Sequence, residues 1–438
     1  MKVLLMDIKR PGDNKDYNGG FGTTFNVGKS LRSRFLSLIR SNMENFPTMS
    51  YAYIAAIFKK YGHQAKYSVN ENQNVDMFDV LLIHASLIRH NEEIKFLGKI
   101  RHKIKIGVYG PLATIKPELF DGIADFIIIG EPEEAIIKIA KTSKIPEGRV
   151  KSSYIKDLDS LPFPDWSIFP YKSYSFSPIL PLRPFTFVLA SRGCPYKCSY
   201  CPYLVFGNYR VRKPENLIKE LIHLKKKYGI KAFYFRDPTF SLGENRIKKI
   251  AHLMIKNNLN LKWGCETRTD LLAIPLIKIL YKAGLRAIKI GVESTDHALL
   301  KKHSRIPPAV EHQEEIIKFC EKIGIKVIAF YILGIPGDTR NSIKNAIRYS
   351  KKLNTSFVNF TVCTPIPGTP FYKQMSSKIT DSNLNHYDNF HVVFKHDNLT
   401  KEEILRYQEE AICGYYIRFG CILKYLFDKI KIDMARKK

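Results

Sequence analysis

Short apolar runs alternate with amphipathic stretches along the first third of the chain. Residues 80–84 are almost entirely apolar, as in a strand buried on both faces, whereas residues 49–61 repeat apolar positions at helical spacing and stop before Gly62. Strands that alternate with helices form parallel sheets covered on both faces. The pattern therefore predicts a doubly wound, Rossmann-like α/β domain over residues 1–145. Its expected strands are Val3–Ile8, Gln64–Val69, Val80–His84, Ile104–Tyr109 and Phe126–Gly130, and its expected helices are Met49–Tyr61, Glu92–His102 and Glu133–Ala140.

A second series of strands and helices follows a linker. Residues 146–183 are rich in proline and aromatic residues, which interrupt helices and favour an extended crossing. Six β-α units in residues 184–375 predict a partial (β/α)6 barrel of the TIM type, with its site at the carboxyl ends of the strands. Residues 376–438 predict polar loops and a helical, basic C-terminal region from Lys401. The expected barrel strands are Thr186–Ala190, Ala232–Arg236, Lys262–Glu266, Ala287–Gly291, Lys326–Ile332 and Phe357–Cys363.

The formal net charge of +29 leaves three interpretations: a lysine-rich surface, contact with anionic lipid, or binding of nucleic acid. Basic residues recur in nearly every block of ten without an RNA-binding signature, which makes nucleic acid the least favoured. No apolar stretch reaches the ~20 residues that span a bilayer. The short apolar run at the N-terminus soon meets Asp7 and Lys9, so a first strand is expected rather than a signal peptide, and a cytoplasmic location with it.

The C-terminal segment, residues 414–438, mixes aromatic and basic side chains. Such a mixture can lie at a membrane surface, which would suit a lipid-like substrate. The favoured alternative is a helix packed on the barrel. The residues concerned are Tyr415, Tyr416, Phe419, Leu423, Tyr425, Leu426 and Phe427, with Arg418, Lys424, Lys429 and Lys431.

Three cysteines lie within eight residues, in the run SRGCPYKCSYCPY. Cys194, Cys198 and Cys201 form a C-x₃-C-x₂-C pattern, and no cysteine precedes them in the chain. Three thiolates can hold three irons of a cubane and leave the fourth iron open to another ligand. A structural zinc site is the alternative, but it needs a fourth ligand nearby, and no histidine occurs between His102 and His223. The spacing therefore predicts a [4Fe–4S] cluster.

This pattern, with Tyr200 before the last cysteine, resembles that of the radical S-adenosylmethionine (SAM) superfamily. The resemblance implies that SAM chelates the open iron and is cleaved reductively to a 5′-deoxyadenosyl radical, with an electron from a donor such as flavodoxin or ferredoxin.

Other family landmarks follow in order. They imply that Tyr200 lies near the adenine, that Asp237 in FRDPTF faces the methionine moiety, and that Arg268 in WGCETRTD pairs with the SAM carboxylate. They also imply cofactor contacts for Glu266, for Glu293 and Ser294 in IKIGVEST, and for the turn Gly334, Ile335 and Pro336 in YILGIPGDT.

The N-terminal half resembles the cobalamin-binding domain that precedes many radical SAM barrels. The resemblance rests on PTMSYAYIAAIFKKYGHQ, FDVLLIHAS, VYGPLATIKPELFDGIADFIIIGEPEEA and LDSLPFPDW. It implies a corrin at the loops after Ile8, Ala85 and Gly110 and at Gly130–Glu131. The D-x-H-x-x-G motif is absent, and neither His84 nor His90 fits it. A domain of this fold that does not bind cobalamin is therefore the alternative.

The segment GTTFNVGKS looks like a phosphate-binding P-loop, but five residues separate Gly22 from Gly28 where that motif has four. We interpret Asn18–Thr24 instead as a flexible loop that covers a cofactor or substrate, or as plain linker.

With both cofactors, the resemblance implies methyl transfer to an unactivated carbon or phosphorus of a small-molecule or lipid-like substrate. Radical cyclisation or rearrangement of the magnesium-porphyrin cyclase type is the first alternative, and a non-catalytic Fe–S or cobalamin-binding regulatory module is the second. Methylthiotransferases are disfavoured, because they need a second cysteine triad in the N-terminal domain, which has no cysteine.

Overall fold

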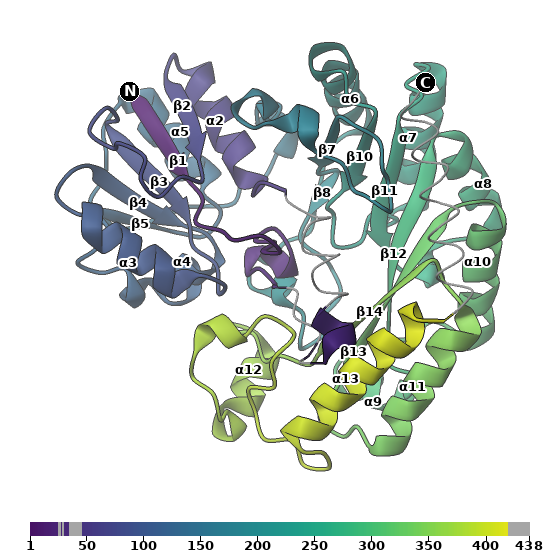
Figure 1. The fold of residues 1–438 in the computed structure, drawn as a ribbon. Helices are drawn as coiled ribbons and strands as arrows, with labels where there is room; N and C mark the ends of the chain where they lie inside the picture. Colours follow the sequence, from purple (N-terminus) through teal and green to yellow (C-terminus); the bar gives the residue numbers. More distant parts are fainter. Residues whose placement is uncertain (25–27, 29, 35–45, 419–438) are drawn as a thin grey trace.

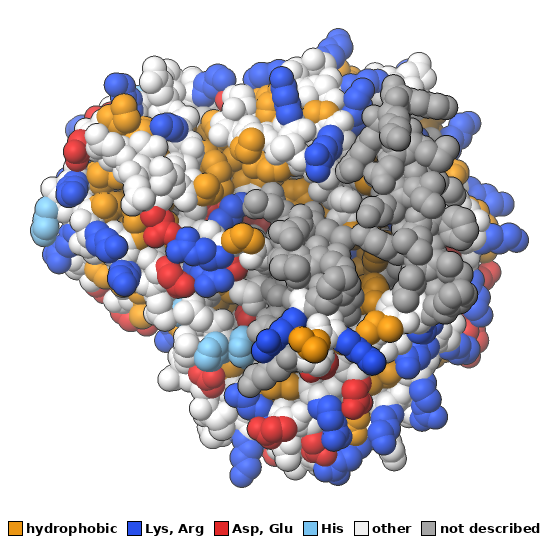
Figure 2. Space-filling model, viewed as in Figure 1, with side chains coloured by type: hydrophobic (Ala, Val, Ile, Leu, Met, Phe, Trp, Pro, Cys, Tyr) orange, Lys and Arg blue, Asp and Glu red, His pale blue; other side chains and the backbone are white. Residues whose placement is uncertain are grey.

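Two parallel β-sheets form two lobes in the computed structural model, which describes residues 1–24, 28, 30–34 and 46–418 (Figure 1). In that part of the chain, no helix is both long and apolar enough to cross a membrane. On the face shown in Figure 2, lysine and arginine side chains are spread over both lobes. The positive charge is therefore not gathered into one stripe on that face.

The N-terminal sheet has six parallel strands in the order β2-β1-β3-β4-β5-β6. The strands are β1 (Lys2–Met6), β2 (Gln64–Ser68), β3 (Val80–His84), β4 (Lys105–Tyr109), β5 (Phe126–Ile129) and β6 (Gly148–Lys151). The helices around it are α2 (Ser50–Lys60), α3 (His90–Ile100), α4 (Pro111–Ile115) and α5 (Glu133–Thr142). The predicted doubly wound α/β fold is confirmed.

Both faces of this sheet are buried, which explains the nearly continuous apolar runs. Val3 and Leu5 pack into the core that contains α2 and α5 residues, whereas Leu4 and Met6 pack into the core that contains α3 and α4 residues. Successive residues of a strand point to opposite faces, so one short strand contributes to both cores.

β6 lies inside the stretch predicted as linker, residues 146–183. It pairs in parallel with β5, with Gly148 beside Phe126. Its sequence, GRVK, is largely exposed at the sheet edge and so lacks an apolar signal. The rest of the stretch ties the lobes together, because the Asp165 carboxylate accepts hydrogen bonds from Lys59 of α2 (2.9 Å) and from Tyr228 of the second lobe (2.8 Å).

The second sheet has the order β7-β10-β11-β12-β13-β14, all parallel, with its helices on the outside (Figure 1). Its six β-α units confirm the predicted partial barrel. The strands are β7 (Phe185–Val188), β10 (Ala232–Phe235), β11 (Lys262–Thr267), β12 (Leu285–Glu293), β13 (Lys326–Leu333) and β14 (Phe357–Val362). The helices are α6 (Pro214–Tyr228), α7 (Glu244–Lys256), α8 (Ile274–Lys282), α9 (His297–Lys302), α10 (Val310–Lys322) and α11 (Arg340–Leu353). A short antiparallel pair, β8 (Ser191–Arg192) and β9 (Arg210–Val211), flanks the cysteine loop.

The C-terminal region continues with α12 (Pro370–Met375) and α13 (Lys401–Tyr416), which packs along β14. Tyr415 donates a hydrogen bond to the Thr355 carbonyl (2.5 Å) and Tyr416 to the Val358 carbonyl (2.7 Å). These contacts favour the packed helix for the start of the segment 414–438. Phe419, Leu423, Lys424, Tyr425, Leu426, Phe427, Lys429 and Lys431 lie outside the described residues.

Two arginines of the β8–β9 pair join the lobes. Arg192 contacts Glu131 (3.1 Å) and Glu133 (2.7 Å), and Arg210 contacts Glu131 (3.0 Å). Both arginine side chains are at most 15% exposed. Glu131, predicted to lie beside a corrin, thus serves as an ion-pair partner across the interface.

We expect Glu131→Gln to lower the free energy of unfolding by about 3 kcal/mol, because it leaves two largely buried guanidinium groups undercompensated. Urea denaturation would measure the change. Asp121→Asn is the matched control, since Asp121 pairs with Arg149 where both side chains are about half exposed, and no measurable change is expected there. Equal shifts in the two variants would contradict a structural role for the interface pair.

Candidate functional site

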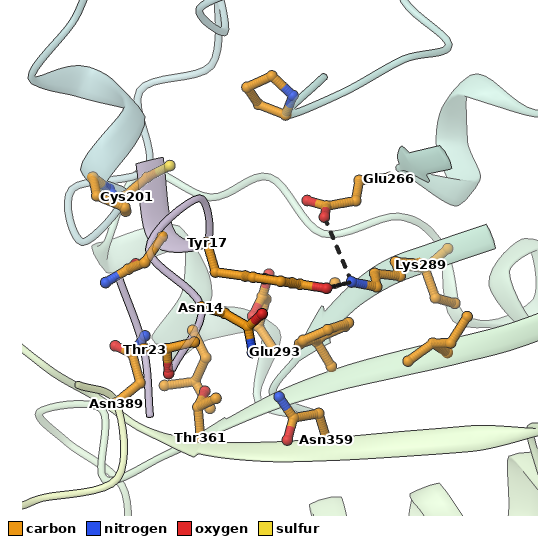
Figure 3. A pocket seen from close by; sticks show the side chains of 18 of the residues that line it. Asn14, Tyr17, Thr23, Cys201, Glu266, Lys289, Glu293, Asn359, Thr361 and Asn389 are labelled. Carbon is orange, nitrogen blue, oxygen red and sulfur yellow. Dashed lines mark hydrogen bonds and ion pairs between the residues drawn. The ribbon is translucent and has the colours of Figure 1, made fainter. Parts of the chain in front are cut away.

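A cavity of about 950 Å³ lies at the carboxyl ends of the barrel strands, between the barrel and residues 12–24 of the N-terminal lobe (Figure 3). Seven of the predicted site residues line it. They are Cys194, Cys198, Cys201, Tyr200, Glu266, Arg268 and Glu293.

The cysteine loop is held between a glycine and a buried carboxylate. Gly193 has a positive φ of 74°, and a side chain there would meet the Asn208 carbonyl at 2.5 Å. Asp237, at the end of β10, accepts hydrogen bonds from the Ala190 amide (2.8 Å) and the Ser191 hydroxyl (2.5 Å). These contacts fix where the loop leaves β7, and all three cysteines of the loop line the cavity.

Burial favours the protonated form of two of the three thiols. Burial raises the pKa of Cys201 to about 12 and also raises that of Cys198, where Arg305 opposes the effect. Metal binding must therefore displace protons. Among the described residues, no three His, Cys, Asp or Glu side chains are placed to hold a single metal ion. This absence does not argue against a cubane, because each thiolate of a cubane site binds a different iron.

Glu293 and Arg305 form an ion pair beside the cysteines. Their closest atoms, Oε1 and Nη2, lie 3.5 Å apart, and Arg305 also donates to the Gly291 carbonyl (2.5 Å). A Cβ at Gly291 would lie 2.1 Å from Glu293 Oε1, so glycine leaves the room that this carboxylate occupies. Burial raises the pKa of Glu293, although Arg305 and Arg268 oppose the rise.

The cavity also contains buried polar atoms without hydrogen-bond partners among the described residues: Arg268 Nη1, Arg305 Nε and Tyr200 Oη. The remaining guanidinium nitrogens of Arg268 are engaged by Asp270 (2.8 Å) and the Ile306 carbonyl (2.7 Å). Unsatisfied cationic donors beside three thiols fit a cluster with an anionic ligand such as the SAM carboxylate.

Five predicted site residues are not among those lining the cavity. Asp237 lies beneath the cysteine loop, as described above, and burial raises its pKa to about 6. The Ser294 hydroxyl accepts a hydrogen bond from the Asp296 amide (3.1 Å). In the turn Gly334–Ile335–Pro336, the first two amides donate to Asp338 (3.0 Å each). SAM contacts by these five residues stay predictions.

A charged cluster was missed by the sequence analysis. Arg236 pairs with Glu266 (2.5 Å), and Lys289 contacts the Tyr17 hydroxyl (3.1 Å) and Glu266 (3.8 Å). Figure 3 shows Tyr17 reaching from the N-terminal lobe toward Lys289. A lysine inside the apolar strand sequence LRAIKIGVE was the available signal, because buried lysines need partners. Tyr17 had no such local signal.

Residues 13–22 fill the crevice where the resemblance placed a corrin. Phe21 is fully buried, and its carbonyl accepts a hydrogen bond from the Leu87 amide (2.9 Å). A side chain at Gly20 would meet Pro111 and His84. The predicted covering loop thus packs on the ends of β3 and β4, at the position where the resemblance implies a corrin.

His84 lies beneath this segment, at the end of β3. It is 5% exposed, and its Nδ1 has no hydrogen-bond partner among the described residues. Burial, aided by Lys15, lowers its pKa to about 3, so the imidazole is neutral.

Comparison with known proteins identifies the second lobe. Residues 188–350 match the family model of the radical SAM superfamily. An uncharacterised methyltransferase of Pyrococcus horikoshii is 27% identical over 360 residues, which cover 76% of this chain and 77% of that protein.

One further relative and one solved structure are similar to this chain. The anaerobic magnesium-protoporphyrin IX monomethyl ester cyclase of Rubrivivax gelatinosus is 25% identical over 67% of this chain, which spans only 53% of the cyclase. The structure of the radical SAM methyltransferase TsrM from Kitasatospora setae, with cobalamin and a [4Fe–4S] cluster bound, has a TM-score of 0.61 and 14% identity. The match covers 86% of this chain and 78% of TsrM, and shows a shared fold.

The position of Asp237 predicts different results for two substitutions. Asp237→Ala leaves the Ala190 and Ser191 donors unsatisfied, which costs about 1–3 kcal/mol each, and should lower the iron content after cluster reconstitution. Asp237→Asn can bond to both groups and should retain stability, iron and SAM affinity. Urea denaturation would measure the stability, iron analysis the cluster content, and calorimetry the SAM affinity. If Asp237 contacts SAM directly, Asp237→Asn will keep its iron and lose SAM affinity.

Proposed function

Because residues 188–350 match the family model of the radical SAM superfamily, we propose that this chain cleaves SAM reductively at a [4Fe–4S] cluster and methylates an unactivated carbon or phosphorus of a small-molecule substrate. One observation carries the proposal: three thiols and two arginines with unsatisfied donors face the same cavity. When bound, the cluster would supply the electron that splits SAM, and cobalamin would supply the methyl group.

The chain's own residues have separable tasks in this proposal. Cys194, Cys198 and Cys201 hold the cluster. Arg268 and Arg305 bind the SAM carboxylate, because each offers a buried donor to an anion. Glu293 balances the charge of Arg305 and can accept a hydrogen bond from SAM.

Relatives of both kinds match this chain. Methylation is preferred over cyclisation because the match covers 77% of the Pyrococcus horikoshii methyltransferase but only 53% of the cyclase. Cobalamin is the methyl carrier we propose, by analogy with TsrM. Its binding at the first sheet requires residues 13–22 to leave the crevice.

Two partners belong to the same proposal. The positive surface suits an acidic electron donor such as flavodoxin or ferredoxin, because opposite charges steer association. Peripheral membrane contact through the C-terminal segment would suit a lipid-like substrate, and a cytoplasmic location is part of the proposal.

Cys198→Ala should abolish both the cluster and SAM cleavage, because one iron then lacks its thiolate. Iron analysis and 5′-deoxyadenosine assay after anaerobic reconstitution and reduction would measure the two effects. Cys320→Ala, at a buried cysteine of α10, is the matched control and should retain both. Absence of 5′-deoxyadenosine from fully reconstituted wild-type protein would refute the proposed activity.

Cobalamin binding should expose residues 13–22. We expect hydroxocobalamin to co-elute with the protein and to raise amide hydrogen exchange in this segment, with no change in α7. Asp13→Ala should tighten binding, because it removes the Arg89 ion pair (2.8 Å) that anchors the segment. Binding without the exchange change would place cobalamin elsewhere, and failure to co-elute would contradict its proposed role.

A further inference from the structure

The loop that carries the three cysteines reaches the surface of the barrel lobe. Pro195 and Lys197, which lie between its first two cysteines, are exposed, whereas Cys198 is buried. The proposed reaction needs an electron at this loop, and the rate of electron transfer falls steeply with distance. The surface around Pro195 and Lys197 is therefore the part of the molecule where an electron donor has to come close.

A second segment, residues 303–306, packs directly against the cysteine loop. The Ser199 amide donates a hydrogen bond to the His303 carbonyl (2.9 Å), and the Ser199 hydroxyl lies 3.1 Å from His303 Nδ1. The Ile306 carbonyl accepts a hydrogen bond from Arg268 (2.7 Å), whose guanidinium lies 4.3 Å from the centre of the Tyr196 ring. These contacts hold the two segments side by side at the surface.

The second segment exposes an apolar side chain next to basic ones. Ile306 is 70% exposed, and among the large apolar side chains that the structure describes only Leu31 is more exposed. Lys301 and Lys302 form the last turn of α9, four to five residues before Ile306, and both are exposed. An exposed apolar side chain of this size within a polar surrounding is typical of a contact site for another protein.

The two segments contain no acidic residues of their own. Residues 191–213 and residues 297–310 lack aspartate and glutamate, although the chain has 41 of them. Asp270, which lies beside these segments, is paired with Arg268 (2.8 Å), and Glu311 follows in the first turn of α10. An acidic partner therefore meets mainly opposite charge at this part of the surface.

From this juxtaposition, and resting on the proposed function, we propose that a small acidic electron-carrier protein docks here. We call the site the donor surface and define it by Pro195, Lys197, Lys301, Lys302 and Ile306. The lysines steer the acidic partner toward the cysteine loop, and Ile306 gives it an apolar contact on arrival. The docked partner is oxidised by one electron, which reduces the cluster that the three cysteines would hold.

Charge alone does not select a docking site on this protein, because basic side chains are spread over both lobes (Figure 2). The donor surface differs from the rest in two respects: it contains Ile306, and it includes part of the cysteine loop itself. Weak, short-lived electron-transfer complexes bury less area than stable ones. One apolar side chain with a basic rim is therefore enough for such an encounter.

Flavodoxin is the probe that tests the donor surface on the reconstituted full-length protein. Lys301→Glu/Lys302→Glu should slow flavodoxin association about tenfold at low ionic strength, because it replaces attraction by repulsion. Ile306→Ala should weaken flavodoxin binding about fivefold by removing the apolar contact. Stopped-flow and equilibrium titration under anaerobic conditions would measure the two effects.

Formation of 5′-deoxyadenosine from SAM provides a second readout. With reduced flavodoxin as the donor, its rate should fall in both variants, whereas with excess dithionite it should equal that of the wild type. Lys226→Glu/Lys227→Glu is the matched control. It changes the net charge equally at the end of α6 that precedes β10, opposite the cavity, and should leave both readouts unchanged.

Three results would each overturn the proposal. They are the absence of flavodoxin binding to the wild type, unchanged binding in the Lys301/Lys302 and Ile306 variants, and equal losses in the Lys226/Lys227 control. A loss with dithionite at full iron content would also contradict it, since the segment would then serve the cavity rather than the donor. Flavodoxin binding does not depend on SAM cleavage. Wild-type protein that forms no 5′-deoxyadenosine with dithionite would refute the proposed reaction, while the binding data alone decide the donor surface.

Discussion

A charge buried without a partner destabilises a protein by several kcal/mol, and this constraint governs the mouth of the barrel. Arg236 at the end of β10 is paired with Glu266 of β11, and Arg305 after α9 is paired with Glu293 of β12. Each pair joins two different elements. The pairs therefore fix the strand ends relative to one another, and with them the walls of the cavity.

The same constraint brings the N-terminal lobe to this mouth. Lys15 is 1% exposed and contacts Asp7 (3.2 Å) and Glu93 (2.5 Å). Burial alone would raise the pKa of Asp7, but Lys15 and Lys9 hold it below its usual value. Anchored there, the following residues carry Tyr17 to Lys289 and Asp16 to Arg236, whose Nη2 donates to the Asp16 carbonyl (2.8 Å). One cavity thus has walls from both lobes.

The sequence predicts most of the architecture because most strands are buried on both faces and therefore appear as nearly continuous apolar runs. β3 begins and ends where the pattern places it, whereas β6 was missed because an exposed edge strand has no such run. Cysteine spacing likewise predicts thiols on one loop. It cannot predict Asp237, since a carboxylate after a strand can face either the cavity or the loop beneath it. Tyr17 depends on contacts between distant segments, which no local pattern encodes.

α13 gives β14 a property that an outermost strand does not usually have. The backbone of β14 that faces away from β13 is bonded to side chains and a loop: the Val358 amide and carbonyl to Tyr416, the Phe360 carbonyl to Gln408, and the Val362 amide to Asn389. An exposed edge invites pairing with strands of other chains. Here the covering helix closes that edge to strand addition, so the barrel can remain open on this side without becoming a template for aggregation.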